Sequence, residues 1–408
     1  MTSDGLAWVC CQLGAREHFA VPRALRASGN LAEVITDFWM APRQTARRLY
    51  PRSLRERYHA DLNETRVRSF NRAALVFEAG NALRIQPVWD GIIRRNEWFQ
   101  DRALRELAKI AERSPGSAHR LFAYSYAARR LLEFAKSRGW TTVLGQIDPG
   151  LADERIGAAA REQYPDLGAK WMPAPARYWK NWREECRLAD IVMVNSTWSA
   201  RALIQESVPR EKLRVVPLAY EPSCEATEFQ RSYPSEFSGD RPLRVLFLGQ
   251  VSIRKGVAAI FEAMALLHGA PVQFWFVGRQ LIQVPSNSAV GADARWVGSV
   301  ARGEVEQYYR DCDVFLFPTL SDGFGLTQLE AQAWKLPIIA SRRCGDVVKD
   351  GVNGLLLDDV SGVAIAEAIR QLVAMPSRLA ALSRGSISAS EFGLERLKRE
   401  FETLFPPD

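Results

Sequence analysis

The sequence predicts an α/β protein built from two doubly wound parallel sheets that face each other across a cleft. Short apolar runs alternate with longer helical patterns along most of the chain, which is typical of parallel strands joined by crossover helices. The alternation restarts after a stretch rich in serine, proline and mixed charges at residues 223–241, so we expect two domains joined by a linker there. The chain has 408 residues, which is enough for two hydrophobic cores.

Residues 1–222 form the expected N-terminal domain. A glycine turn at Gly14 separates its first strand from its first helix. The expected strands are residues 6–13, 34–38, 141–146, 191–195 and 213–217. The expected helices are residues 15–26, 119–138, 152–189 and 196–207, together with an arginine-rich, mainly helical part at 41–113.

Residues 242–385 form the expected C-terminal domain. Its strands are predicted at residues 243–248, 272–277, 294–297, 314–318 and 337–340, and its helices at 257–267, 302–312 and 326–334. We expect residues 386–408 to form a helical segment that packs back toward the N-terminal domain. Ligands of doubly wound sheets bind beyond the carboxyl ends of the strands, so the cleft between the domains is the expected site.

The composition excludes several classes of protein. Hydrophobic residues make up 47% and charged residues 25%, which are values of globular chains rather than disordered ones. No apolar run approaches the ~20 residues of a membrane span, and the first residues lack the pattern of a signal peptide, so a cytoplasmic location is expected. The six cysteines and four histidines show no metal-ligand spacing, and we expect no structural zinc.

The net charge of +7 is unevenly distributed. Residues 1–222 hold 35 Lys and Arg against 25 Asp and Glu, whereas the remainder holds 19 against 22. Nine arginines fall between residues 41 and 72: Arg43, Arg47, Arg48, Arg52, Arg55, Arg57, Arg66, Arg68 and Arg72. Such a stretch can meet nucleic acid, anionic lipid or an anionic substrate, or it can be a solvated helical face.

A loop between a buried strand and a helix carries the first candidate binding site. Asp322 opens a glycine-containing loop, and the next helix is expected to begin near Thr327 with Glu330 three residues on, the spacing of a capping box. Glycines let a backbone approach a ligand, and the free N–H groups of a helix start favour anionic oxygens. The two carboxylates can accept hydrogen bonds from ligand hydroxyls. A helix cap with a solvated aspartate is the alternative interpretation.

A second candidate site follows the strand at residues 243–248. The strand runs into Gly249, and a short turn then presents Arg254 and Lys255 before the next helix. Basic groups at the carboxyl end of a strand can neutralise a departing diphosphate if the fold aims them into the cleft, and surface charges are the alternative. The chain has neither a Walker loop nor a strand-coupled GxGxxG motif, which argues against nicotinamide and flavin binding.

As a set, these segments resemble the retaining glycosyltransferases of family 4, the group 1 glycosyltransferases with the GT-B fold. Further segments follow in the order of the family, namely residues 276–278, 296–298, 309–314, 336–341 and 350–355, preceded by 188–196 and 213–217. The resemblance is strong over residues 188–360 and weak over residues 1–187. It implies two Rossmann-like domains facing across a cleft, with a nucleotide-sugar donor on the C-terminal domain and the acceptor on the N-terminal one.

The resemblance implies roles for individual residues. Lys255 would contact the donor diphosphate with Arg254 as a helper, Glu330 would hold the ribose, and Asp322 would face the hydroxyls of the transferred sugar. Gly14 would let the N-terminal domain close on the phosphates. The other implied donor-binding positions are Gly249, Gln250, Gly298, Gly323, Phe324, Gly325 and Leu326. No metal is expected, because no acidic motif beside a strand resembles the metal clamp of the other main glycosyltransferase fold. No cofactor is expected, because the nucleotide sugar is itself a substrate.

The sequence departs from the family at three positions. The first acidic residue is Asp322, where the family usually has glutamate, and Gln250 stands where many members have arginine. The second change leaves more of the phosphate site to Lys255 and Arg16. A cleft histidine of many members is replaced by Gln146 and Asp148 in residues 144–149. His18 and His119 are candidates to substitute for it, and a structural role is the alternative for both.

These features predict a retaining, metal-independent transfer of a sugar from a nucleotide diphosphate to a hydroxyl of a glycan, lipid-linked or small-molecule acceptor. The expected setting is polysaccharide or glycoconjugate synthesis of the bacterial type. In the mechanism that the resemblance implies, the leaving phosphate accepts the proton of the acceptor. A non-catalytic nucleotide-sugar binder or partner subunit and a sugar phosphorylase with pyridoxal phosphate are the alternatives.

The basic N-terminal half carries a further expectation about partners. Nucleic acid is not expected, since no recognised nucleic-acid module accompanies the arginines. Residues 43–72 are instead expected to form a docking face for an anionic membrane at its inner surface, a lipid-phosphate-linked acceptor or an acidic glycan. The oligomeric state does not follow from the sequence.

Overall fold

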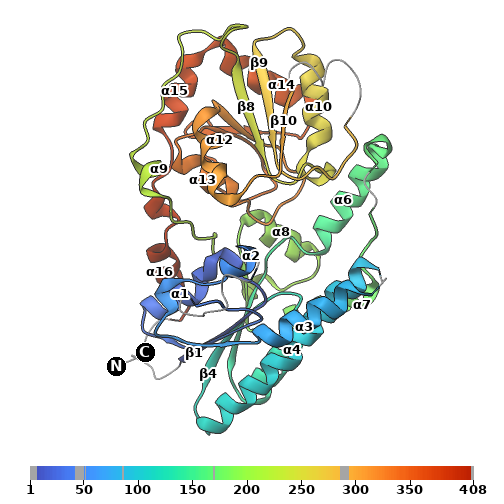
Figure 1. Ribbon diagram of the computed structural model, residues 1–408, viewed down its shortest axis with the longest axis vertical. Helices are drawn as coiled ribbons and strands as arrows, with labels where there is room; N and C mark the ends of the chain where they lie inside the picture. Colours follow the sequence, from blue (N-terminus) through green and yellow to red (C-terminus); the bar gives the residue numbers. More distant parts are fainter. Residues whose placement is uncertain are drawn as a thin grey trace.

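The computed structural model describes residues 7–41, 50, 52–84, 87–168, 171–284 and 294–405. Two α/β domains lie one above the other along the long axis of the molecule, the N-terminal domain below and the C-terminal domain above (Figure 1). Each domain contains one sheet whose strands are all parallel. The predicted fold class, two Rossmann-like domains, is therefore confirmed.

The N-terminal sheet has seven strands in the order β3 (Arg66–Ser69), β2 (Leu31–Thr36), β1 (Ala7–Gln12), β4 (His119–Tyr124), β5 (Thr141–Gly145), β6 (Ile191–Val194) and β7 (Leu213–Val215). Its helices are α1 (Ala20–Ala27), α2 (Arg52–Arg55), α3 (Asn71–Ala82), α4 (Val88–Arg113), α5 (Arg129–Ser137), α6 (Leu151–Gln163), α7 (Ala176–Leu188) and α8 (Thr197–Gln205). The strand order reverses between β1 and β4, so the turn that follows β1 borders the crevice where such sheets bind ligands.

The C-terminal sheet has six strands in the order β10 (Ala294–Gly298), β9 (Val272–Val277), β8 (Leu243–Leu248), β11 (Val314–Phe317), β12 (Ile338–Ser341) and β13 (Gly354–Leu357). Its helices are α10 (Val257–Leu266), α12 (Val305–Asp311), α13 (Thr327–Ala333), α14 (Gly362–Ala374) and α15 (Pro376–Arg384). The order reverses between β8 and β11, the two strands that precede the two candidate sites.

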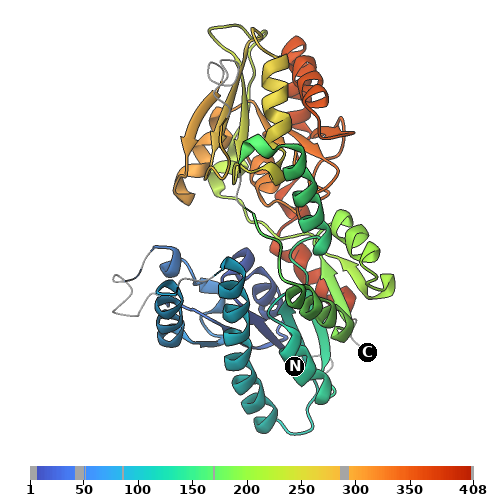
Figure 2. The ribbon, with the colours of Figure 1, turned by 90° about the vertical axis from the view of Figure 1, so that its right-hand side faces the viewer.

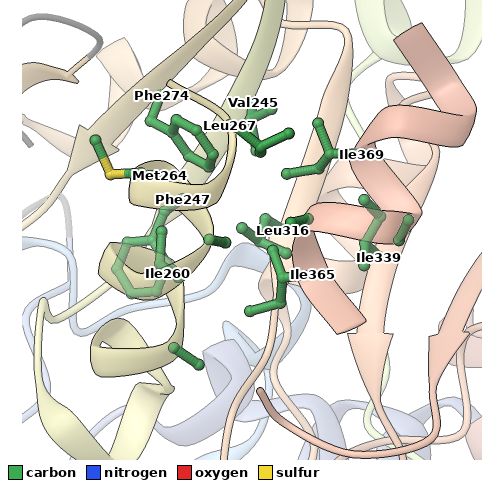
Figure 3. Packing of buried hydrophobic residues seen from close by; sticks show 14 of the residues in the cluster. Val245, Phe247, Ile260, Met264, Leu267, Phe274, Leu316, Ile339, Ile365 and Ile369 are labelled. Carbon is green, nitrogen blue, oxygen red and sulfur yellow. The ribbon is translucent and has the colours of Figure 1, made fainter. Parts of the chain in front are cut away.

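The larger core of the C-terminal domain lies between this sheet and helices α10 and α14. Val245, Phe247 and Leu316 come from β8 and β11, and Ile260 and Ile365 come from the two helices (Figure 3). All five side chains are at most 3% exposed. Because this packing fixes β8 and β11 side by side, it also fixes the loops that leave their carboxyl ends.

The end of the chain returns to the N-terminal domain. Helix α16 (Leu394–Leu404) runs down beside α1 (Figure 1). Phe401 is 4% exposed and meets the ring of Trp8 edge-on, with 5.4 Å between the ring centroids. Arg396 donates a hydrogen bond to the carbonyl oxygen of Pro217. The last helix is thus part of the N-terminal core.

The stretch between the domains packs against the C-terminal domain. It contains the short helix α9 (Cys224–Glu228), and Arg231 reaches from it to backbone carbonyls at the ends of two helices. The guanidinium donates to the oxygens of Tyr309 (2.6 Å), Cys312 (2.5 Å) and Trp334 (3.0 Å). These hydrogen bonds hold the connection at residues 223–241 against the C-terminal domain, so it is not a flexible linker.

The helix predicted at residues 119–138 is wrong in its first third. Residues 119–124 form β4, which pairs with β1 and β5, and only residues 129–137 are helical. A strand buried on both faces reads as a continuous apolar run, so periodicity does not separate it from the helix that follows. The break falls at Tyr126, whose φ of 73° is left-handed.

The remaining predicted strands are confirmed to within three residues at each end. The mainly helical part at 41–113 also contains β3, a short arginine-bearing edge strand that carries little apolar signal. The helical stretch at 152–189 is two helices, α6 and α7, with a short 3₁₀ turn at residues 165–167 between them.

Several of the described arginines near the N-terminus form ion pairs with acidic side chains of the same chain. Arg57 pairs with Asp37 at 2.5 Å, and Arg66 and Arg68 both pair with Glu33 at 3.2 Å. Arg43, Arg47 and Arg48 lie outside the described residues, as does the side chain of Arg52. The expected docking face at residues 43–72 is therefore less cationic in its described part than the sequence suggested.

Candidate functional site

The two candidate sites of the C-terminal domain meet in one ion pair. Lys255 ends a short 3₁₀ turn (Ile253–Lys255) after β8, and Asp322 lies in the loop after β11. The Lys255 ammonium donates a hydrogen bond to Asp322 Oδ2, and each side chain is 17% exposed. Gly256 follows with a φ of 77°, and a Cβ there would lie 1.9 Å from the carbonyl oxygen of Pro318. Glycine is therefore needed for the turn to rest on the end of β11.

The pair keeps Asp322 ionised. Burial alone raises the pKa of this carboxyl, but the charges of Lys255 and Arg254 and the hydrogen bond from Lys255 outweigh burial and hold the pKa below its usual value. The amide of Phe324 adds a weak hydrogen bond to Asp322 Oδ1 at 3.4 Å. The site therefore presents one ammonium and one carboxylate at the edge of the cleft.

Arg254 is not the exposed surface charge that was the alternative. Its guanidinium donates to the carbonyl oxygen of Ser321 at 2.7 Å and lies 3.4 Å from Asp153 Oδ1 of α6, in the other domain. Its own carbonyl accepts a hydrogen bond from the amide of Leu320 at 2.9 Å. Arg254 thus holds the loop after β11 and joins it to the N-terminal domain.

Gly323 is one of the points where the two domains touch. Its carbonyl oxygen accepts hydrogen bonds from the hydroxyls of Ser196 (2.7 Å) and Ser199 (3.3 Å) at the start of α8. A Cβ at Gly323 would lie 2.4 Å from the carbonyl oxygen of Ile147. The sequence assigned this glycine to a close approach of ligand, and in the structure its close neighbour is the N-terminal domain.

Glu330 lines a cavity of about 170 Å³ that is shared by the two domains. Glu330 Oε2 accepts a hydrogen bond from the hydroxyl of Tyr309 at 2.7 Å. Burial raises the pKa of Glu330, while Tyr309 and the charge of Arg302 oppose that rise. The lining residues from the other domain include Glu17, His18 and Arg23. We call this space the Glu330 cavity.

The predicted capping box is wrong. The residue before α13 is Leu326 rather than Thr327, and its side chain gives no cap. Glu330 therefore lies one turn inside the helix, with its carboxylate directed to Tyr309 instead of to the helix start. This leaves Glu330 free of a capping role and places it where a ligand of the cavity can reach it.

The turn that precedes α1 has an unusual backbone. Glu17, His18 and Phe19 all have left-handed φ angles, of 49°, 49° and 61°, although none is glycine. Such conformations are uncommon for these residue types and gather at ligand sites. Glu17 accepts a hydrogen bond from the hydroxyl of Tyr124 at 3.1 Å, and burial raises its pKa to about 7. The sequence showed no sign of this turn, because no glycine marks it.

A second cavity of about 210 Å³ lies at the carboxyl ends of β4, β5 and β6. Arg16, Gln146 and Asn195 line it, and it shares Glu17 and Leu326 with the Glu330 cavity. We call it the Gln146 cavity. It lies on the N-terminal side of the cleft, next to the loop that carries Asp322.

Gln146 and Asp148, which stand where the family has a histidine, form one polar network. Asp148 Oδ1 accepts hydrogen bonds from Tyr126 (2.5 Å), from Gln146 (3.0 Å) and from the amide of Gly150 (2.9 Å). Burial raises the pKa of Asp148 to about 6. The indole of Trp182 donates a hydrogen bond to Gln146 Oε1 at 3.0 Å, and this bond fixes the side-chain amide of Gln146, which lines the cavity.

The two histidine candidates, His18 and His119, lie in different parts of the N-terminal domain. His18 lines the Glu330 cavity and contacts Arg302 of the other domain through Nε2. His119 begins β4, at the opposite end of the strand from the cleft, and its ring packs edge-on against Trp140 with 4.7 Å between centroids. The suggestion that His119 replaces the cleft histidine is therefore wrong.

A third cavity of about 430 Å³ lies within the N-terminal domain. Gly14 lines it after β1 and donates its amide to Asp37 Oδ1 at 2.9 Å, so this N–H is occupied. Helix α3 contributes Ala74, Leu75 and Glu78 to the wall. We call it the α3 cavity.

The other predicted donor positions lie at the carboxyl ends of β8 and β10 and in the loop after β11. Gly249 follows β8 beside an exposed Gln250, and Gly298 ends β10, where its carbonyl accepts a hydrogen bond from the amide of Gly278 at 2.8 Å. None of these three lines the cavities described above. The side chain of Phe324 is 1% exposed and belongs to the core, so only its backbone is available to a ligand.

Within the described ranges, no group of three or more His, Cys, Asp and Glu is placed to hold a metal ion. Metal independence stays a prediction. Arg302 and Glu17 are among the cavity residues that sequence reasoning missed, because only the tertiary structure brings their segments to the cavity.

Comparison with known proteins agrees with this geometry. Residues 242–375 match a family model described as glycosyl transferases group 1. A D-inositol 3-phosphate glycosyltransferase of Catenulispora acidiphila is 30% identical over 168 residues, which cover 36% of this chain and 40% of that protein. An amylovoran biosynthesis glycosyltransferase of Erwinia amylovora is 23% identical over 198 residues, covering 45% of this chain and 47% of that protein. The chain thus matches less than half the length of these curated relatives.

Solved structures resemble the chain over nearly all of its length. Sucrose-phosphate synthase from Thermosynechococcus elongatus has a TM-score of 0.64 at 18% identity and covers 98% of both chains. HepE from Anabaena, solved with UDP, has a TM-score of 0.62 at 16% identity, covering 98% of this chain and 99% of that one. At such identities the likeness establishes the fold, which is the two-domain GT-B arrangement.

Proposed function

We propose that this chain is a glycosyltransferase that moves a sugar from a nucleotide-diphosphate donor to a hydroxyl group of an acceptor. The observation that carries the proposal is the Lys255–Asp322 pair at the switch point of the C-terminal sheet, in the part of the chain that matches group 1 glycosyl transferases. The names of the relatives support synthesis of a polysaccharide or glycoconjugate as its setting. The complexes of HepE with UDP and with UDP-glucose support a nucleotide sugar as the donor.

The pair is suited to bind the two ends of the reacting bond. An ammonium has three N–H donors, and Asp322 uses one of those on Lys255, so two remain for the oxygens of a diphosphate. Asp322 stays ionised and can accept hydrogen bonds from sugar hydroxyls. The other carboxylate, Glu330, lies in the cavity shared by both domains, where the hydroxyls of a ribose can reach it.

The proposed reaction proceeds with retention and without a metal. The bond between the anomeric carbon and the donor phosphate oxygen breaks, and a bond from the acceptor oxygen to the same face of that carbon forms. The acceptor proton goes to the departing phosphate, so no protein base is required. Charge develops on that phosphate, and Lys255, fixed in advance by Asp322, stabilises it without reorganisation. The two carboxylates serve binding rather than the acid and base roles of a glycosidase pair.

The acceptor belongs on the N-terminal side in this proposal. The Gln146 cavity adjoins the loop of Asp322, and the aromatic and polar network behind it supplies rigid hydrogen-bonding groups. Positioning of the acceptor hydroxyl by such groups accounts for much of the expected acceleration. The acceptor assay distinguishes three classes of acceptor, namely glycans, lipid-linked sugars and small molecules.

A donor screen tests the proposal. Thermal unfolding is followed with a panel of nucleotide sugars, because a bound donor raises the transition temperature by mass action. The stabilising donor is then incubated with acceptors, and release of the nucleoside diphosphate is measured with and without EDTA. NMR of the product reports the anomeric configuration. Stabilisation without turnover on any acceptor or water would favour the non-catalytic binder, and turnover that needs inorganic phosphate would favour the phosphorylase.

A further inference from the structure

Helix α3 has two unlike faces. One face closes the α3 cavity with Ala74, Leu75 and Glu78. The other carries Arg72, Val76, Ala79 and Leu83, which follow at the spacing of one side of a helix and are all exposed. In Figure 2 α3 lies at the outer left edge of the N-terminal domain, on the side away from α16.

The outer face of α3 is apolar to a degree that folding does not require. Val76 is 75% exposed and Leu83 is 87% exposed, and Val88 at the start of α4 is 73% exposed. Single exposed apolar side chains are common on protein surfaces, but a row of them along one helix marks an interaction site. We call Arg72, Val76, Leu83, Arg84 and Val88 the α3 face.

The charges around this row are positive. The one acidic residue of α3 is Glu78, which points to the cavity side and pairs with Arg95 through both oxygens at 2.5 Å. Arg72 and Arg84 are exposed and make no ion pair with any described residue. Exposed apolar side chains beside arginines that have no acidic partner among the described residues suit a surface that offers both apolar and anionic groups, as an anionic bilayer does.

We propose that the α3 face docks on the surface of an anionic lipid membrane. No helix of the described residues has the length and apolarity of a bilayer span, so the contact would be peripheral. A second copy of the chain is a poorer occupant, because a two-fold contact through this face would bring the unpaired arginines of both copies together. The proposal relocates the basic docking face that the sequence placed at residues 43–72.

Docking through the α3 face would bring the α3 cavity close to the membrane, where a lipid-linked acceptor could reach it; this step rests on the proposed function. Because α3 presents one face to the bilayer and the other to the cavity, the cavity would lie about one helix diameter, roughly 10 Å, from the lipid surface. An acceptor whose sugar is attached to a lipid phosphate can then enter from the membrane. The α3 face thus selects lipid-linked acceptors over free sugars.

Vesicle binding by the full chain tests the proposal. Sedimentation with vesicles of phosphatidylglycerol and phosphatidylcholine is compared with sedimentation with phosphatidylcholine alone, at low and high salt. The test variant is Val76→Glu with Leu83→Glu, which keeps good helix formers on an exposed face. The control is Val363→Glu with Met375→Glu, which adds the same charge at sites of the other domain that are 65% and 56% exposed.

We expect binding to the anionic vesicles that weakens with salt and falls at least about tenfold in the test variant but not in the control. Equal binding to both kinds of vesicle, or equal loss in both variants, would overturn the proposal. A dimer of the native chain that the test variant abolishes, without vesicle binding, would assign the face to a second copy and would also overturn it.

The same variants separate this proposal from the proposed function. Turnover of the donor with a water-soluble acceptor should be unchanged in the test variant, since no residue of the α3 face touches the Glu330 or Gln146 cavity. A chain that binds vesicles through the α3 face but shows no transfer with any donor would refute the proposed function and leave the docking intact.

Discussion

Replacing Lys255 by alanine is expected to abolish most of the catalytic rate. In the proposed reaction the variant lacks the cation that would face the departing phosphate, and loss of one preorganised donor at a developing charge costs on the order of 10²-fold or more in rate. Release of nucleoside diphosphate, measured under saturating donor, reports this loss. The structure adds a second expectation, because the same ammonium neutralises a largely buried carboxylate.

The stability of the Lys255→Ala variant should change with pH in a defined direction. Both side chains of the pair are 17% exposed, and removing one partner of a buried pair costs about 3 kcal/mol. In the native chain the pKa of Asp322 lies below its usual value of 3.8, so its stabilising contribution is present above that value and is lost as the pH falls through the folded-state pKa. In the variant the charge and the hydrogen bond of Lys255 no longer oppose burial, and only Arg254 and the amide of Phe324 still do, so the pKa of Asp322 is higher than in the native chain and the carboxyl is protonated at a higher pH. The difference in unfolding free energy between the two proteins should therefore shrink from pH 7 to pH 4.

A matched lysine provides the control for both measurements. Lys349 pairs with Glu391 at 3.2 Å, but these side chains are 60% and 47% exposed. Surface pairs of this kind contribute about 0–1 kcal/mol, so Lys349→Ala should unfold and turn over almost as the native chain does. If Lys255→Ala behaves like Lys349→Ala in turnover and in urea unfolding, the reasoning about the ion pair is refuted.

Three further variants probe the rest of the site. Glu330→Ala should lower kcat/KM by about 10²-fold because a ribose hydroxyl loses its acceptor in a buried cavity, and near-normal kinetics would contradict that role. Gly323→Ala places a Cβ 2.4 Å from the carbonyl oxygen of Ile147, so the domains must separate at this contact. We expect a lower unfolding temperature and weaker donor binding. Gly239→Ala, whose Cβ meets open space, is the control and should change neither. Glu17 gains its charge near pH 7, so the affinity for an anionic donor, measured by calorimetry, should fall as the pH rises through about 7, and Glu17→Gln should remove that dependence.

Both halves of the candidate donor site could be located in the sequence because each is local. Gly249 to Lys255 follows one strand, and Asp322 to Glu330 follows another, so the strand–turn–helix pattern locates them without any long-range contact. The parallel order of the sheet then places the two strand ends at one edge. The pairing of Lys255 with Asp322 across 67 residues could not be predicted, because it depends on the register of β8 beside β11.

The features that could not be predicted from the sequence are those that depend on contacts between segments far apart in the chain. β4 reads as part of a helix because burial on both faces removes the alternation of a strand. The left-handed turn at Glu17 is carried by residues that avoid this conformation in isolation, so only the surrounding packing specifies it. Arg302 lines the Glu330 cavity and contacts His18 of the other domain, and nothing in its own segment indicates that.

One short loop connects the ligand site to the contact between domains. Asp322 binds Lys255, and the next residue, Gly323, accepts the hydroxyls of Ser196 and Ser199 from the N-terminal domain. Asp322 and Gly323 are adjacent, so a ligand that binds at the Lys255–Asp322 pair also acts on the peptide that accepts the hydroxyls of Ser196 and Ser199. Coupling between two binding events is reciprocal, so if a donor strengthens the Gly323 contact by some factor, complete loss of that contact weakens donor binding by the same factor. The sensitivity of donor affinity to Gly323→Ala therefore measures the coupling between donor binding and this one contact between the domains.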